Sequence, residues 1–275
     1  MREKIWINGI SAETLSAPER GFRFGDGLFE TMGVCKNRIP LLDFHIKRIL
    51  QDAEYLAFEL PELDWHKTIL SLIDDVNPEL TSNAVLNLWL WRAGGGRYQP
   101  QTNECQWVVR IQKRDIPLWE EPMHGLKLGI ETRHQKAKGR LSNIKSCNGL
   151  LYVLASELAV ENQFDDVLIC NTEGAFLESS NSNLFALIDN KILTPPLADG
   201  CLKGVMREWL IHHASDLGLE IELRPISKED LKAASEIWLT NAISGIRWVE
   251  TFEGQEYGKQ KALEIQSELQ NRLKG

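Results

Sequence analysis

A polar, proline-marked passage from Arg114 to Gly125 constrains the fold more than any other feature of this sequence. It separates two long stretches in which strand-like apolar runs alternate with amphipathic helical segments. With 275 residues, 43% of them hydrophobic, the chain is long enough for one large domain or two of ordinary size. The sequence therefore predicts two lobes, formed by residues 1–116 and 117–275.

The first predicted lobe combines short strands with two helices. Apolar residues such as Ile46, Ile49 and Ala53 fall on one face of a helix expected from Leu42 to Phe58. A second helix is expected from Leu63 to Val76, because Asn77-Pro78 ends it. The predicted strands of this lobe are Ile5–Asn8, Leu28–Val34, a short strand after a Lys36-Asn37 turn, Val85–Trp91 and Trp107–Ile111.

The second predicted lobe is richer in strands. Its helices are expected to run from an N-cap at Asn148 to about Asn162, from near Gly204 to Leu217-Gly218, and from Gln255 to Leu273. Its predicted strands are Leu126–Glu131, Asp166–Cys170, Ala175–Leu177, Asn183–Ile188, Ile221–Arg224 and Ile237–Leu239. This mixture of hairpins and helices predicts an α+β fold, whose strand pairing the pattern does not reveal.

Charge and cysteine usage exclude several functional classes. The net charge is −8, and 31 basic residues are scattered among 39 acidic ones, which disfavours a nucleic-acid or membrane partner. The N-terminus lacks the apolar run of a signal peptide, and no stretch is long enough to span a bilayer. The five cysteines form no CxxC pair, so we expect reduced thiols, no metal site and a soluble, cytoplasmic protein.

Lys145 stands in the segment Ser142 to Asn148, directly before a predicted helix. A lysine that forms a Schiff base needs an ordered backbone and a partly desolvated amine, because only the neutral amine attacks an aldehyde. The position before a helix suits this chemistry. A solvated surface lysine is the alternative, and Lys145 taken alone does not decide against it.

Glu178 follows an apolar strand and precedes four small polar residues, Ser179 to Ser182. A carboxylate at such a strand end suits pairing with a protonated ring nitrogen, which keeps a pyridinium cofactor electron-withdrawing. A polar loop with a solvated glutamate is the alternative reading of this segment taken alone.

Five ordered segments resemble the signature of class IV pyridoxal-phosphate enzymes, a superfamily that includes branched-chain aminotransferases, D-amino acid aminotransferases and 4-amino-4-deoxychorismate lyases. The block from Glu173 to Phe185 resembles the pattern E-G-x-x-x-E-S-x-x-x-N-L-F. The other four segments are Arg20–Thr31, Leu41–Arg48, Gly200–Arg207 and Leu239–Ala242. The resemblance implies a two-lobed fold-type IV enzyme with a small N-terminal α/β lobe and a larger, β-rich C-terminal lobe with helices. It further implies a homodimer whose pocket lies between the lobes and near the subunit boundary.

The resemblance also implies roles for individual residues. Lys145 would bind pyridoxal 5'-phosphate covalently and act as the catalytic base, and Glu178 would face the pyridine nitrogen. The cofactor phosphate would be held by Arg48, by the backbone of Val205 and Met206 at a helix start, and by Asn241 and Ala242. His45 is expected to be a structural hydrogen-bonding residue rather than a catalyst.

The expected substrate is an amino compound that bears a carboxylate. The glycine-rich stretch Arg92 to Tyr98 resembles that of aminodeoxychorismate lyases, and Arg92 and Arg97 suit carboxylate binding. Phe24 and Thr31 are further candidate substrate contacts, and Thr31 stands where branched-chain aminotransferases commonly have glycine. Ala93 and the Arg97-Tyr98 junction depart from the lyase pattern. Lyase activity therefore leads as the predicted function, an amino-acid aminotransferase follows closely, and a non-catalytic relative is the third alternative.

Overall fold

The computed structural model describes residues 3–12, 14 and 19–274, and its chain divides into two compact units. The first comprises residues up to Leu118 together with Lys145–Asn148, and the second comprises Trp119–Ile144 and Gly149–Leu273. The division between Leu118 and Trp119 falls in the proline-marked passage, where the sequence predicts a boundary at 116/117. The segment Lys145–Asn148 belongs to the first unit although it follows the boundary in the sequence, so a single boundary does not separate the two units.

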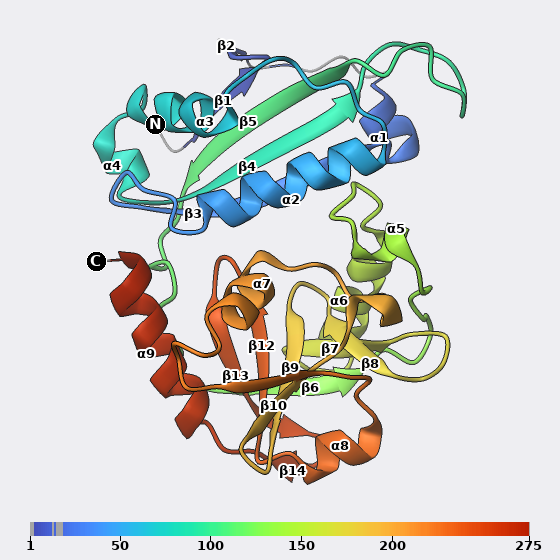
Figure 1. Cartoon of the computed structure of the whole chain (residues 1–275), viewed down its shortest axis with the longest axis vertical. Helices are drawn as coiled ribbons and strands as arrows, with labels where there is room; N and C mark the ends of the chain where they lie inside the picture. The colour runs from blue at the N-terminus through green and yellow to red at the C-terminus, as the bar shows by residue number, and fades with distance from the viewer. Residues whose placement is uncertain (1–2, 13, 15–18, 275) are drawn as a thin grey trace. The chain divides into compact units, whose positions relative to one another are not determined.

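The first unit is an antiparallel sheet with helices (Figure 1). The strand order is β2-β1-β5-β4-β3. Along β4, the fully buried Ala84, Leu86 and Leu88 alternate with partly exposed residues, as a pleated strand requires. Helix α2 lies against β3. The elements are β1 (Glu3–Ile7), β2 (Ile10–Ser11), α1 (Arg20–Phe24), β3 (Gly27–Cys35), α2 (Leu42–Tyr55), α3 (Trp65–Asp74), α4 (Pro78–Thr81), β4 (Asn83–Arg92) and β5 (Cys105–Lys113).

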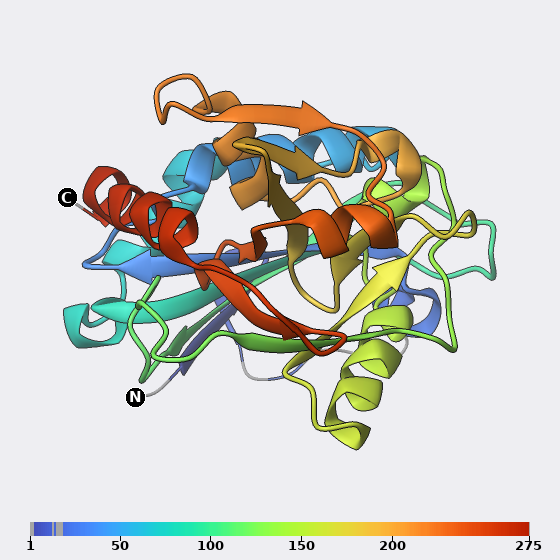
Figure 2. The same cartoon turned by 90° about the horizontal axis from the view of Figure 1, so that it is seen from below.

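The second unit is built on a mixed sheet that closes on itself. The strand order is β11-β10-β9-β12-β13-β6-β7-β8, and β8 also pairs with β9. Helix α6 packs against β7 (Figure 2). The elements are β6 (Leu126–Ile130), α5 (Arg140–Asn143), α6 (Leu150–Glu161), β7 (Asp166–Cys170), β8 (Phe176–Ser179), β9 (Asn183–Ile188), β10 (Lys191–Thr194), η1 (Leu197–Asp199), α7 (Val205–His212), β11 (Glu220–Leu223), α8 (Lys228–Ala233), β12 (Glu236–Asn241), β13 (Gly245–Phe252), β14 (Gln255–Glu256) and α9 (Gln260–Lys274).

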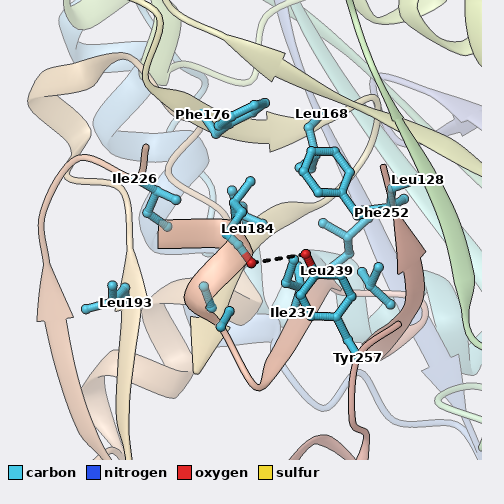
Figure 3. Packing of buried hydrophobic residues seen from close by; sticks show 14 residues of the cluster. Leu128, Leu168, Phe176, Leu184, Leu193, Ile226, Ile237, Leu239, Phe252 and Tyr257 are labelled. Atoms are coloured by element: carbon cyan, nitrogen blue, oxygen red, sulfur yellow. Dashed lines mark hydrogen bonds between the residues drawn. The ribbon is translucent and has the colours of Figure 1, made fainter. Parts of the chain in front are cut away.

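An apolar core fills one side of this second sheet (Figure 3). The rings of Phe176 and Phe252 meet edge to face with centroids 6.0 Å apart. The buried Tyr257 hydroxyl donates a hydrogen bond to the carbonyl of Leu231, so the ring brings no unsatisfied donor into the core. Leu184 of β9 and Leu239 of β12 also face this core. Because side chains alternate along a strand, their neighbours Asn183 and Thr240 point to the opposite face of the sheet.

All five predicted helices are shorter in the structure, and two of them differ most. The terminal helix begins at Gln260, because Gly254, with φ of 80°, turns the chain so that Gln255–Glu256 pairs with β13. Helix α7 ends at His212, before the predicted Leu217-Gly218. The strands at Asp166–Cys170 and Asn183–Ile188 are confirmed at both ends, and the overall α+β prediction is confirmed. Within the described residues, no helix combines the length and apolar character needed to cross a membrane.

Candidate active site

The segment Lys145–Asn148, called the lysine segment below, pairs antiparallel with β3 of the first unit. The Lys145 carbonyl accepts a hydrogen bond from the Phe29 N–H at 3.0 Å, and the Cys147 N–H donates to the Gly27 carbonyl at 2.8 Å. The Lys145 Nζ lies 4.2 Å from the centroid of the Phe29 ring, and the side chain is partly buried. The structure therefore gives Lys145 an ordered backbone and a partly buried position, which suit Schiff-base chemistry.

Gly25 allows this segment to approach β3 closely. Its φ is 64°, and a Cβ at this position would lie 2.4 Å from the Asn148 Oδ1. The Asn148 Nδ2 donates to the Gly25 carbonyl at 3.2 Å. The prediction that Asn148 caps the following helix is wrong, because the cap position is Gly149 and no side chain bonds to the helix N-terminus there. The asparagine instead fixes the lysine segment to the glycine turn.

A buried ion cluster lies on β3 and α2 in the same unit. The Arg48 Nε donates to the Glu30 Oε1 at 2.7 Å, and the His45 Nδ1 lies 2.6 Å from the Glu30 Oε2. Burial opposes ionisation of Glu30, but the charges and hydrogen bonds of Arg48 and His45 outweigh it and lower the pKa from 4.5 to about 2. Burial also lowers the pKa of His45, against the opposing effect of Glu30. His45 thus has the hydrogen-bonding surroundings expected from the sequence, and Arg48 is anchored by a carboxylate that sequence reasoning missed.

In the second unit, Glu178 is buried and held by three donors. Its Oε1 accepts hydrogen bonds from the Lys136 ammonium and from the Tyr152 hydroxyl, the latter at 2.8 Å. Its Oε2 accepts from the Leu202 N–H at 2.6 Å. Burial, followed by the charge of Glu178, raises the pKa of Tyr152 well above its ordinary value, so the hydroxyl remains a donor at neutral pH. The alternative of a solvated loop glutamate is therefore wrong for this chain.

Sequence reasoning missed Lys136 and Tyr152 because each lies far from Glu178 in the chain. The separations are 42 and 26 residues, and the closure of the sheet brings them together. Tyr152 is on helix α6, whereas Lys136 lies in the passage that follows β6. A polar tyrosine in the otherwise apolar start of α6 was the only signal in the sequence.

A row of polar side chains crosses the sheet next to Glu178. Glu178 of β8 pairs with Asn183 of β9, which in turn lies opposite Thr240 of β12. The Asn183 Nδ2 donates to the Leu202 carbonyl at 2.9 Å, and a Cβ at Gly204 would overlap the Asn183 Oδ1. The buried Thr240 Oγ1 has no hydrogen-bond partner among the residues that the structure describes. This face thus contains an ordered polar row with unused hydrogen-bonding capacity.

Helix α7 begins beside this row. Val205 and Met206 are its first two residues, and its N-cap, Gly204, provides no side-chain hydrogen bond. The first N–H groups of a helix lack intrahelical acceptors, and the helix dipole favours negative charge there. The N-terminus of α7 therefore has the general properties of an anion site, and a phosphate contact of the backbone of Val205 and Met206 stays a prediction.

Asn241 orders the loop that follows β12. Its Oδ1 accepts from the N–H groups of Ile243 and Ser244 at 2.9 and 2.7 Å, and its Nδ2 donates to the Ser182 Oγ at 2.9 Å. The carbonyl of Ala242 accepts from the indole of Trp119 at 2.9 Å. The structure thus gives the Asn241 side chain a role in shaping the loop, and a phosphate contact of either residue stays a prediction.

The predicted substrate contacts lie in the first unit and differ in their surroundings. The Arg92 Nη2 donates to the Leu56 carbonyl at 2.7 Å, so this guanidinium is engaged within the fold. The Thr31 hydroxyl accepts from the Asn87 Nδ2 at 3.2 Å. Phe24 packs against Tyr98 with ring centroids 5.7 Å apart. Arg97 is exposed, and within the described part of the chain its side chain has no hydrogen bond or ion pair.

This chain is similar to known proteins in both sequence and structure. The aminodeoxychorismate lyase of Bacillus subtilis (strain 168) is 29% identical over 97% of this chain and 92% of its own length. The D-alanine aminotransferase of Bacillus licheniformis is 25% identical over 98% of this chain and 97% of its own length. The crystal structure of 4-amino-4-deoxychorismate lyase from Pseudomonas aeruginosa matches with a TM-score of 0.84 and 26% identity, covering 98% of this chain and all of that chain.

The family model for amino-transferase class IV matches residues 27–252, well over half of the chain. The predictions of a class IV enzyme, of a fold-type IV architecture and of pyridoxal phosphate as the cofactor are confirmed at the level of the family. The matched range includes both Lys145 and Glu178. The chain belongs to the class IV amino-transferase family.

Proposed function

We propose that the protein is a 4-amino-4-deoxychorismate lyase, which converts its substrate to 4-aminobenzoate and pyruvate. The observation that carries the proposal is the similarity, over nearly the full length of both chains, to the lyases of B. subtilis and P. aeruginosa. The geometry supports the pyridoxal-phosphate chemistry that this reaction requires, and Thr31 supports the choice of a lyase over a branched-chain aminotransferase.

The residues of the second unit fit the cofactor. Glu178 is a buried carboxylate whose orientation Lys136, Tyr152 and Leu202 fix, and this suits an acceptor for a pyridine N–H. The N-terminus of α7 and the Thr240 hydroxyl, which has no hydrogen-bond partner within the described part of the chain, suit a phosphate group. When bound, pyridoxal phosphate supplies an electron sink for the carbon that bears the amino group.

Lys145 is the residue proposed to hold the cofactor covalently. Once the substrate amine has replaced it, the Lys145 amine would remove the proton from the carbon that bears the substrate's amino group. Arg48 is proposed as a phosphate contact and Glu178 as the partner of the ring nitrogen. Arg97 is proposed to bind a substrate carboxylate, with Phe24 and Thr31 contacting the substrate ring. Arg92 is a weaker candidate for this role, because its guanidinium is bound to the Leu56 carbonyl at the end of α2.

An amino-acid aminotransferase is the second candidate. The observation that favours it is the 25% identity with the D-alanine aminotransferase of B. licheniformis over 98% of this chain. The two activities share the cofactor and differ in what happens after proton removal, because a transaminase returns the proton to the cofactor and needs an oxo-acid acceptor.

We further propose that the enzyme is a cytoplasmic homodimer. Helix α6 exposes several large apolar side chains: Leu150 is 69% exposed, Val153 54% and Val160 76%. A cluster of this kind on one helix suits burial against a second copy of the chain. All five cysteines are free thiols, which suits a reducing compartment. Light scattering of the purified protein measures the oligomeric state, and a monomer would contradict the dimer.

A substrate panel tests the reaction. The purified protein, supplied with pyridoxal phosphate, is incubated with 4-amino-4-deoxychorismate alone and with L- and D-amino acids plus 2-oxoglutarate. Release of pyruvate and 4-aminobenzoate without an oxo acid is the expected result. Exchange of amino groups without release of pyruvate and 4-aminobenzoate would contradict the lyase proposal and support the aminotransferase proposal.

Borohydride reduction tests the role of Lys145. Reduction of the loaded protein should leave a pyridoxyl group on Lys145 in peptide mapping, and Lys145→Ala should lose this adduct and lower kcat by at least about 10⁴-fold. Lys67→Ala is the control, because Lys67 is exposed and its ion pair among the described residues is with Asp64, the N-cap of its helix. An unchanged adduct in Lys145→Ala would disprove the assignment.

A further inference from the structure

The buried guanidinium of Arg20 is not used by any role described above. Arg20 is the first residue of α1, and 2% of its surface is exposed. Its Nε donates to the Asp26 Oδ2 at 2.7 Å, which provides the charge partner that a buried cation requires. The remaining nitrogens point to the loop between β4 and β5.

Arg20 binds the backbone of that loop at three carbonyl groups. Its Nη1 donates to the carbonyls of Gly95 and Arg97 at 3.1 and 2.8 Å, and its Nη2 donates to the carbonyl of Tyr98 at 3.5 Å. Carbonyl groups of a loop ordinarily turn to water, so one side chain that binds three of them fixes the path of the loop. The contacts of Arg20 therefore position this loop.

The fixed backbone directs two side chains outward. Tyr98 is 90% exposed, and its ring packs against Phe24, which in turn lies 5.1 Å from the Arg20 guanidinium. Arg97, between two of the anchored carbonyls, presents its guanidinium to solvent. An exposed cation and an exposed aromatic ring on one anchored loop are suitable contacts for a cyclic carboxylate.

We propose that Arg20 is a positioning residue that pre-organises Arg97 and Tyr98 for the carboxylate of the amino substrate. This inference rests on the proposed function. A receptor that is already ordered loses less entropy when the ligand binds, so Arg20 acts on substrate affinity through Arg97 without touching the substrate. A lysine cannot replace it, because a single ammonium lacks the fork that reaches Asp26 and the carbonyls together.

The test compares Arg20→Lys and Arg20→Met with the wild-type holoenzyme. The probe is 4-amino-4-deoxychorismate, or D-alanine with 2-oxoglutarate if the substrate panel selects transamination. We expect KM to rise about tenfold while kcat changes less than about twofold. The variants weaken the binding of the substrate and of the transition state equally, and they leave the chemical step unchanged. Hydrogen exchange of the backbone at residues 94–98 should accelerate in both variants.

Arg23→Lys is the matched control. Arg23 lies on the same helix and faces the same Phe24 ring at 4.7 Å, but it is exposed and holds no loop carbonyl. This variant should retain the wild-type KM and the wild-type exchange rates. Equal acceleration of exchange in the control and in Arg20→Lys would assign the effect to α1 as a whole and overturn the proposal.

A double variant decides whether Arg20 acts through Arg97. If it does, Arg20→Lys in an Arg97→Ala background raises KM no further than Arg97→Ala alone. Additive losses would overturn the positioning role. The exchange measurement also separates this inference from the proposed function, because it reports on the loop even if the wild-type protein turns over neither probe.

Discussion

Two buried carboxylates, Glu30 in the first unit and Glu178 in the second, are held in different ways. Glu30 meets a forked guanidinium and an imidazole from the neighbouring helix α2, and both its oxygens receive charged or polar partners. Glu178 meets an ammonium and a phenol on one oxygen, but only a backbone N–H on the other. Each carboxylate receives three such contacts, so the two differ in the charge of their donors and not in the number. A guanidinium bound through two nitrogens suits a carboxylate that anchors the fold, whereas a carboxylate held by one ammonium and two neutral donors is the one proposed to bind a ring nitrogen.

Removing the charge of Glu30 tests the anchoring role and has the largest expected effect on stability. Glu30→Gln should lower the free energy of unfolding by about 3–5 kcal/mol, because it removes the charge of the buried carboxylate that pairs with Arg48. Urea unfolding followed by circular dichroism measures the change. In the control Glu3→Gln, which disrupts an exposed pair with Arg110, the loss should be below about 1 kcal/mol. Equal losses in the two variants would contradict an anchoring role for Glu30.

The pH dependence of stability gives a second test of the anchoring role of Glu30. The pKa of Glu30 falls from 4.5 to about 2 on folding, so its contribution is fully present above pH 4.5 and is lost as the pH falls through about 2. This shift corresponds to about 3 kcal/mol at neutral pH. Unfolding measured at several pH values from 5 to 2 should show a steep loss of stability in the wild-type protein and a shallower one in Glu30→Gln. Parallel curves would show that Glu30 does not account for the acid sensitivity.

Removing the cation beside Glu178 should have a smaller effect. Lys136→Met should lower the free energy of unfolding by about 1.5–3 kcal/mol, since Tyr152 and the Leu202 N–H continue to bind the carboxylate. The double variant Lys136→Met with Glu178→Gln should recover part of this loss, because no unpaired charge remains. Lys138→Met, an exposed neighbour paired with Glu173, is the control and should change stability little. A loss in Lys136→Met as large as that in Glu30→Gln would remove the distinction between the two sites.

The predicted elements and the observed ones agree best where the signal is local. Alternation along Val85–Trp91 and the apolar face of Leu42–Phe58 are properties of a few neighbouring residues, and the structure has β4 and α2 there. The prediction for Asn148 was wrong because an asparagine side chain suits a helix cap and a turn carbonyl equally well. Strand β10 and helix α8 were missed, although Ser227 and Asp230 form a capping box at the start of α8.

The sequence by itself determined the class of the protein, because five short motifs preserve the order and chemistry of a known family, and it determined most helices and strands, because their periodicity is local. Only the tertiary structure decided how the key side chains are held. Lys145 is ordered by pairing with β3, Arg48 by Glu30, and Glu178 by Lys136 and Tyr152. These partners lie tens of residues apart in the sequence, and strand pairing brings them together. A local sequence pattern does not show which distant residues will be in contact.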